Sequence, residues 1–326
     1  MRVFLQHLAR LVLLNRSGIM GVAIIWIFLL HSAIGQNYFG VDNYILDHGW
    51  VGVDIFIFLS SFGLCFSFSK NSLKQFYYRR LVRVIPTWLI ILFLIHIIGL
   101  IVSPLYPNMQ FVYPRNFIDI ICWYTGIGYW INGCFYEWYV PTLLLLYLIF
   151  PFIYKLSNRS LWGILILITV LTLSFYYWEF LFNIRLSYTR LIAYILGVLF
   201  YRYLNANQLQ TFYIPIFALS LIMFVIHKRF GISDVFLYEY LTPILVLIIA
   251  WLINILKLTN VLSFWGAISL EFYLIHLYRR PQFFVGIFTD SVLLQHVIAF
   301  FLCTVAAYIL NRIMKNVNQY FLNFVK

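Results

Sequence analysis

The stretch GVAIIWIFLLH, residues 21–31, places ten uncharged residues in a row before a single histidine. A transmembrane helix needs about 20 mostly apolar residues to cross about 30 Å of hydrocarbon. The run that contains this stretch, residues 19–35, approaches that length and carries no Lys, Arg, Asp or Glu. We therefore expect residues 19–35 to form a membrane-spanning helix.

The rest of the chain has the same character. Of its 326 residues, 64% are hydrophobic and 10% are charged, whereas soluble domains are about 45–50% apolar and about 25% charged. The sequence therefore predicts an all-α, polytopic membrane bundle of about ten helices that forms a single domain over residues 1–326. Besides 19–35, the predicted spans are 51–69, 84–102, 138–155, 161–178, 189–204, 211–227, 236–256, 264–280 and 291–311.

The distribution of basic residues predicts how these helices are oriented. Fifteen of the 22 Lys and Arg residues fall on one side, which the positive-inside rule assigns to the cytoplasm, with both termini inside. We expect residues 1–18 to be an amphipathic segment on the inner surface, and we expect no cleavable signal peptide. Residues 103–137 form a long outer loop, within which 116–131 are predicted to be interfacial or re-entrant.

The formal charge of +12 raises the question of nucleic-acid binding. The basic residues lie in short segments between apolar runs and form no continuous stripe, so we exclude nucleic acid as a partner. Contact with anionic lipid headgroups accounts for them instead. The four cysteines have no metal-ligand spacing, and we expect no metal.

His31, near the outer end of the first span, is the first ionisable residue that stands out within the membrane. An ionisable side chain in hydrocarbon costs at least about 2.5–3.5 kcal/mol on insertion scales, which makes it a functional hypothesis by default. Imidazole is the commonest general base, so His31 is a candidate catalytic residue. A histidine that is hydrogen-bonded to a neighbouring helix is an equally good interpretation of its position.

An arginine cluster lies in FYYRRLVRVIP, residues 76–86, at the inner end of the third span. Arg80 and Arg83 are three residues apart, so they share a helix face and can hold one polyanion together, with Arg79 assisting. Guanidinium groups match phosphate geometry in particular. Positive-inside anchoring is the alternative explanation.

Three further ionisable residues lie in apolar runs. Asp54, at the outer start of the second span, could pair with an arginine, orient His31, or favour its helix N-terminus. Glu271 and His276 lie in SLEFYLIH, residues 269–276, about 140° apart around a helix. They cannot both face one ligand closely, so one of them is expected to pack against a neighbouring helix.

These pieces together resemble acyltransferase family 3, the integral-membrane O-acyltransferases of bacterial surface glycans. The resemblance spans nearly the whole chain. It rests on the run ending in His31, on GVDIFIFLSSF (52–62), FYYRRLVRVIP (76–86), EWYVPTLLLLYLIFP (137–151) and SLEFYLIH (269–276), and on their order and spacing.

The resemblance implies transfer of an acyl group, usually acetyl, from cytoplasmic acyl-CoA to a hydroxyl of a surface or lipid-linked saccharide. His31 matches the family's catalytic histidine, while Arg80 and Arg83 match the pair thought to hold the donor. Asp54, Glu137 or Glu271 could orient the imidazole. The expected location is the bacterial inner membrane, with acyl-CoA as co-substrate and no permanently bound cofactor.

Two positions depart from the family pattern. An arginine is usual eleven residues before the histidine, where this chain has Met20, and Arg16 could substitute for it from about one turn away. Ser61 stands in FLSSF where LSGF is usual, and we expect it to alter only local helix packing. A flippase for a lipid-linked saccharide, or an inactive scaffold, are the alternatives to the enzyme.

Overall fold

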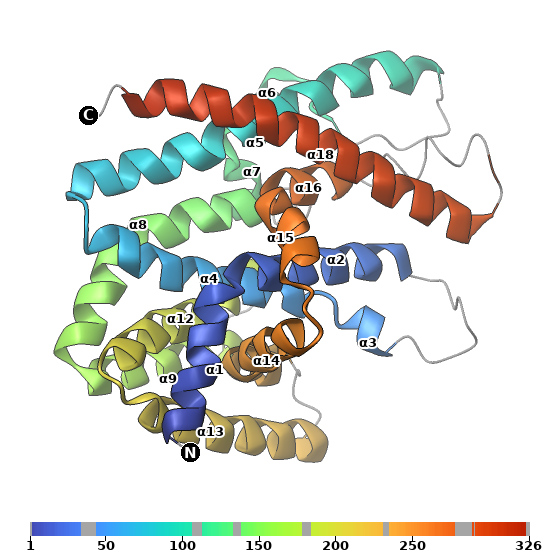
Figure 1. The fold of residues 1–326 in the computed structure, drawn as a ribbon. Helices are drawn as coiled ribbons and strands as arrows, with labels where there is room; N and C mark the ends of the chain where they lie inside the picture. Colours follow the sequence, from blue (N-terminus) through green and yellow to red (C-terminus); the bar gives the residue numbers. More distant parts are fainter. Residues whose placement is uncertain are drawn as a thin grey trace.

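The computed structural model describes residues 2–33, 44–105, 113–132, 138–177, 184–230, 235–277, 289 and 291–323. All regular secondary structure within these ranges is helical, which confirms the all-α class (Figure 1). The helices are α1 (Arg2–Leu14), α2 (Arg16–Ala33), α3 (Tyr44–Asp47), α4 (Val51–Phe68), α5 (Leu73–Leu105), α6 (Phe117–Thr125), α7 (Ile127–Asn132), α8 (Tyr139–Arg159), α9 (Leu161–Tyr177), α11 (Arg185–Tyr188), α12 (Arg190–Asn205), α13 (Leu209–Phe230), α14 (Val235–Ile255), α15 (Thr259–Ala267), α16 (Ser269–His276) and α18 (Val292–Leu322).

Six of the described helices are long and apolar enough to cross a membrane, or seven if the bent pair α1–α2 counts as one span. They are α4, α5, α8, α13, α14 and α18. Every predicted span overlaps a helix, but the count of ten is not confirmed. The shortfall arises because α9 and α12 are short, at 17 and 16 residues, and because the range 264–280 falls on two short helices, α15 and α16. The N-in/C-in orientation stays a prediction.

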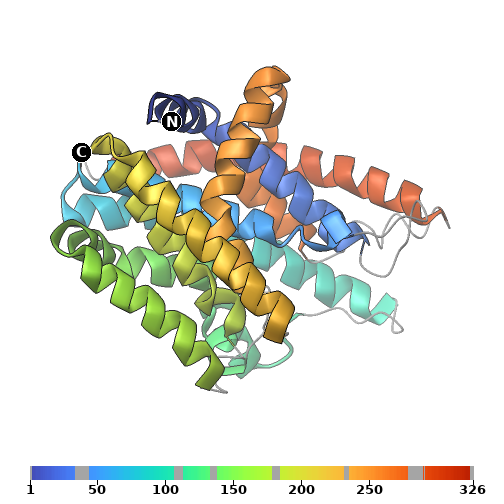
Figure 2. The ribbon, with the colours of Figure 1, turned by 90° about the horizontal axis from the view of Figure 1, so that it is seen from below.

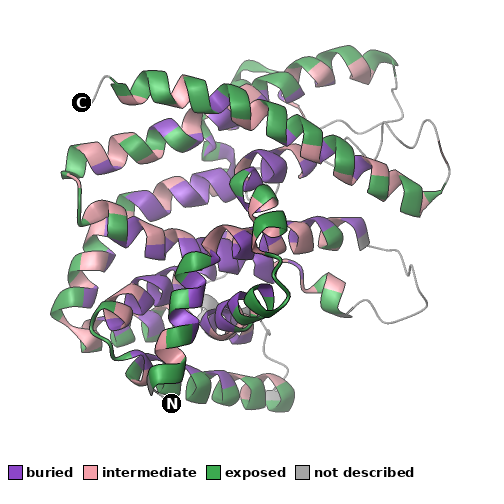
Figure 3. Ribbon diagram, viewed as in Figure 1, coloured by how far each residue is buried: buried purple, intermediate pink, exposed green. Residues whose placement is uncertain are grey.

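Burial is highest in the middle of the bundle and lowest on its outside (Figure 3). The central helix α4 packs against α2, α12 and α14, whereas α18 lies along one side and α13 along the other (Figures 1 and 2). The outer helices expose large apolar side chains, such as Phe301 at 60% on α18 and Phe217 at 57% on α13. Such a surface is suited to lipid, and the chain is a multi-pass membrane protein.

The first two helices meet at Asn15 with a bend of 73°. One face of α1 packs on α13 and α14 and buries Leu8, Ala9, Leu11 and Val12. Its other face exposes apolar side chains, among them Phe4 at 59%. The predicted amphipathic segment is therefore a helix with one face on the bundle, and its position on the inner surface stays a prediction.

Helices α2 and α15 cross unusually closely. A Cβ atom added at Gly21 would overlap the Leu262 carbonyl group, and one at Gly266 would overlap the Ser17 carbonyl group. Small residues allow membrane helices to approach in this way, and the Ser17 hydroxyl donates a hydrogen bond to the Ser263 carbonyl across the same crossing. Since α16 begins two residues after α15 ends, the crossing positions α16 beside α2.

The predicted outer loop contains two short helices, α6 and α7, of nine and six residues. Gly126 separates them with a left-handed backbone at φ 69°, a conformation that favours glycine. Neither helix is long enough to span a bilayer by itself, and the interfacial or re-entrant position of this segment stays a prediction.

Candidate active site

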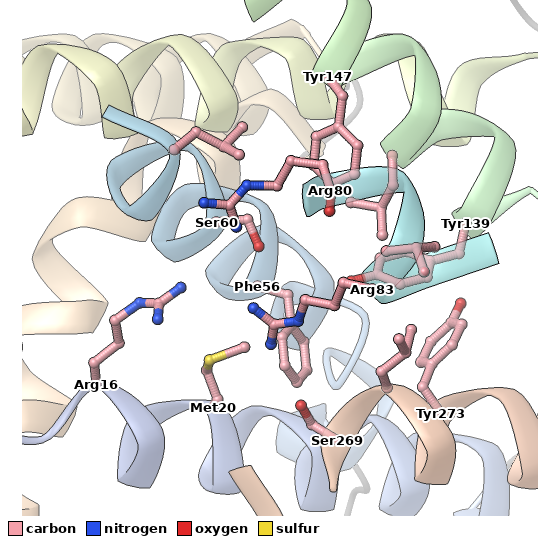
Figure 4. A pocket seen from close by; sticks show the side chains of 14 residues that line it. Arg16, Met20, Phe56, Ser60, Arg80, Arg83, Tyr139, Tyr147, Ser269 and Tyr273 are labelled. Carbon is pink, nitrogen blue, oxygen red and sulfur yellow. The ribbon is translucent and has the colours of Figure 1, made fainter. Parts of the chain in front are cut away.

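A cavity of about 60 Å³ lies among α2, α4, α5, α8 and α16 (Figure 4). This volume holds a few water molecules or a thin chain and is too small for a nucleotide. Its lining residues are Arg16, Met20, Phe56, Ser60, Leu64, Arg80, Arg83, Val84, Tyr139, Leu143, Tyr147, Ser269, Leu270 and Tyr273.

Three guanidinium groups meet at one end of the cavity. Arg80 and Arg83 extend from the same face of α5, and Arg16 extends from the first turn of α2 toward them (Figure 4). Among the described residues, none of the three forms an ion pair with a carboxylate. The Nε atoms of Arg16 and Arg80 are buried without a hydrogen-bond partner in that part of the chain. This end of the cavity is therefore suited to a polyanionic ligand.

Arg16 is held in place by α4. Its Nη2 atom donates a hydrogen bond to the Leu59 carbonyl oxygen at 3.2 Å. A Cβ atom added at Gly63 would lie 2.9 Å from the same nitrogen, so the glycine leaves room for the guanidinium group. Met20, one turn further along α2, also lines the cavity. Arg79 is exposed and does not line it.

Aromatic rings close the opposite end of the cavity. The rings of Tyr139 and Tyr273 lie 4.5 Å apart between centroids, and both side chains line the cavity away from the guanidinium groups (Figure 4). The ring of Tyr273 also contacts the ring of His276 at 5.5 Å. The cavity therefore ends one aromatic ring away from His276.

His276 in turn contacts His31. The Nε2 atom of His276 lies 2.9 Å from the Nδ1 atom of His31, and the two rings are stacked with centroids 5.0 Å apart. His276 is fully buried, and its Nδ1 atom lies 2.9 Å from the Phe272 carbonyl oxygen. Thus α2 and α16 bring together two imidazoles that are 245 residues apart in the chain.

A buried ionic cluster lies beside this region. The Nε atom of Arg190 on α12 is 3.0 Å from the Asp54 carboxylate on α4, and the guanidinium group lies 5.5 Å from the ring centroids of both Trp50 and Trp138. The Glu239 carboxylate on α14 accepts a hydrogen bond from the Ala193 backbone at 3.2 Å. Asp54 thus pairs with an arginine, one of the roles expected for it, and the cluster joins α4, α12 and α14.

Comparison with known families bears directly on this arrangement. A family model described as "Acyltransferase domain" matches residues 18–314, nearly the whole chain. The chain belongs to acyltransferase family 3. Neither the curated proteins nor the solved structures gave a significant match. Membership of this family implies a membrane acyltransferase, and it favours the enzyme over the flippase.

Glu271 and Glu137 are the remaining residues for which the family resemblance predicts a role. The Glu271 carboxylate is buried and accepts a hydrogen bond at 3.1 Å from the Asn311 side chain on α18. Glu271 and His276 therefore face different neighbours, as their spacing predicts. Glu137 lies outside the described residues. The catalytic and binding roles of the candidate site residues stay predictions.

Four residues near the site were not predicted from the sequence. They are Arg190, Glu239, Tyr139 and Tyr273. Glu239 carried a usable signal, because it is a lone carboxylate in the apolar run of α14. The tyrosines carried none, since this chain has 25 of them and the aromatic belt explains many.

The serine that departs from the family pattern has a matching partner. The Ser61 hydroxyl on α4 donates a hydrogen bond to the Phe58 carbonyl at 2.9 Å and faces Gly197 on α12. A Cβ atom at Gly197 would overlap both the Ser61 hydroxyl and the Phe58 carbonyl. Gly197 therefore lets α12 pack closely against α4 at this position.

Proposed function

We propose that this protein is an O-acyltransferase that moves an acetyl group from acetyl-CoA to a hydroxyl of a surface or lipid-linked saccharide in the bacterial inner membrane. One observation carries the proposal. Among the described residues, three guanidinium groups without a carboxylate partner converge in one cavity, and the other end of that cavity lies one aromatic ring, that of Tyr273, from the pair of His276 and His31. Family membership supplies the reaction class.

The donor binds through its charged end. The phosphates of acetyl-CoA rest on Arg80 and Arg83, near the first turns of α5, because guanidinium forks match phosphate oxygens. The cavity is too small for the nucleotide, so only the thin thioester arm enters it. Tyr139 and Tyr273 lie across its path to His31 and must separate for the thioester to pass.

His31 performs the proton transfer. The acceptor oxygen attacks the thioester carbonyl carbon while the hydroxyl proton moves to the His31 imidazole. The new C–O bond forms, the C–S bond breaks, and the departing thiolate of CoA takes the proton back from the imidazolium. Attack by His31 itself, with a transient acyl-imidazole, uses the same ring nitrogen and is the second route.

The decisive experiment compares His31→Ala with the wild-type protein in membranes of equal expression. Transfer of labelled acetyl from acetyl-CoA to the glycan should fall to background with His31→Ala. A histidine on the exposed face of α1 provides the matched control, and His7→Ala should retain full transfer. Unchanged acylation with His31→Ala would overturn the assignment.

A second measurement separates the enzyme from its alternatives. Acetyl esters are measured on the surface polysaccharide of a deletion strain and its parent. Loss of ester from an otherwise normal polymer supports the transferase, whereas loss of the polymer itself supports a flippase. Wild-type protein that neither acylates the glycan nor releases CoA would be an inactive scaffold. Accumulation of labelled acetyl on the protein without acceptor would identify the acyl-imidazole route.

A further inference from the structure

The hydrogen-bond geometry around His276 determines where its proton lies. A carbonyl oxygen can only accept, so the contact of 2.9 Å between His276 Nδ1 and the Phe272 carbonyl places a proton on Nδ1. His276 is fully buried against the rings of Phe28, Phe272 and Tyr273. An ionised ring is costly in such surroundings, so His276 is neutral and carries this one proton.

The assignment of His276 determines the tautomer of His31 as well. With its proton on Nδ1, His276 presents a lone pair at Nε2, and the atom that approaches this lone pair at 2.9 Å is His31 Nδ1. His31 Nδ1 must therefore donate. Neutral imidazole carries one N–H, so the lone pair of His31 is on Nε2.

We infer that His276 is the positioning residue for His31: its hydrogen bond holds His31 in the Nδ1–H tautomer, with Nε2 as the reacting nitrogen. The role in catalysis rests on the proposed acyl transfer, whereas the tautomer follows from the geometry alone. A carboxylate commonly orients a catalytic imidazole. Here the two described carboxylates considered for that role, Asp54 and Glu271, pair with Arg190 and Asn311 instead.

The hydrogen bond between His31 and His276 affects the proton transfer of the proposed reaction. When His31 accepts the acceptor proton on Nε2, its Nδ1–H continues to donate to His276. The new positive charge is therefore stabilised by a hydrogen bond that is already in place, and no proton leaves the pair. The imidazolium then gives the Nε2 proton to the CoA thiolate, and both rings return to their starting tautomers. Among the described residues in ring contact with His276, the ionisable ones are His31 and Tyr273.

The first test measures the tautomer directly and needs no activity. Full-length protein labelled with ¹⁵N-histidine is placed in lipid nanodiscs, and the ring nitrogens are read by solid-state NMR at neutral pH. His31 and His276 should both show Nδ1 protonated and Nε2 unprotonated, with peaks assigned from the His31→Asn and His276→Gln variants. A His31 signal with Nε2 protonated would overturn the inference.

The second test uses a pair of variants at position 276. Gln places an amide oxygen near the position of His276 Nε2 and can accept from His31, whereas Phe keeps a flat ring and cannot accept. His276→Phe should lower kcat about ten- to hundredfold with KM for acetyl-CoA unchanged, and His276→Gln should recover most of it. Equal kcat in His276→Phe and wild type, or equal losses in the two variants, would refute the positioning role.

These tests also distinguish this inference from the proposed function. If His31→Ala retained acylation while NMR gave the expected tautomers, the acyl-transfer assignment would fail and the histidine pair would stand. If His31→Ala abolished acylation while NMR gave the opposite tautomer, the reverse would hold.

Discussion

Arg16 offers the sharpest test of the proposed donor site, because this chain has Met20 at the position where the family pattern usually has arginine. Replacing Arg16 by Met removes one of the three guanidinium groups that meet in the cavity. A charge-assisted hydrogen bond contributes about 1.5–3 kcal/mol. At 1.4 kcal/mol for each factor of ten, acetyl-CoA should bind about ten- to hundredfold more weakly.

The kinetic signature should be specific. Arg16 lies about 22 Å along the helix from His31, since fifteen residues rise 1.5 Å each. Its loss should therefore raise KM for acetyl-CoA and leave kcat nearly unchanged, which is the signature of a lost interaction that is equally strong in the ground state and the transition state. The assay is acetyl transfer by purified protein in proteoliposomes over a range of acetyl-CoA concentrations. Arg10→Met, on the exposed face of α1, is the matched control and should behave as wild type.

A swap of the two side chains completes the experiment. Met20 lines the same cavity one helical turn further along α2, about 6 Å from Arg16. Arg16→Met combined with Met20→Arg should therefore recover most of the lost affinity. The reasoning is refuted if Arg16→Met changes KM less than twofold, or if the swap leaves the loss of Arg16→Met unrepaired.

Three further predictions concern how the bundle holds the site. Gly197→Ala should lower the free energy of unfolding by about 1–3 kcal/mol, measured by thermal unfolding in detergent. Adding Ser61→Gly should not restore the lost stability, because the Phe58 backbone carbonyl also blocks the added methyl group. Arg190→Leu should cost about 3–5 kcal/mol by leaving buried Asp54 without its cation, in the same assay, and a loss below 1 kcal/mol would contradict the cluster's role. Gly266→Leu should give no folded protein on size-exclusion chromatography, because its side chain would overlap the Ser17 carbonyl group. The neighbouring residue Ala267 is exposed, so Ala267→Leu should fold normally.

The sequence predicts the class of this fold well and its number of spans less well. Hydropathy indicates where apolar helices lie, since lipid demands long apolar runs, and every predicted range overlaps a helix. It does not indicate the break at Ile268, where one apolar range becomes α15 and α16. That break depends on how α15 packs across α2, which is tertiary information.

Within the candidate site, too, the sequence predicts what lies on one helix and does not predict contacts between helices. Arg80 and Arg83 were predicted together from their spacing on one helix, and the cavity brings them together. The partnership of His31 with His276 could not be predicted, because pairing between residues 245 apart depends on the crossing of two helices. The sequence offered three carboxylates to orient His31, and the two that the structure describes have other partners.

The tyrosine pair that closes the cavity has a consequence for the cell as well as for the enzyme. Arginine side chains inside a bilayer are hydrated by water. A continuous column of water to the far side would let protons flow down their gradient. The rings of Tyr139 and Tyr273, 4.5 Å apart, interrupt that column before it reaches the histidines. In the proposed reaction, this closure would keep the electrical potential of the membrane while the charged donor is bound.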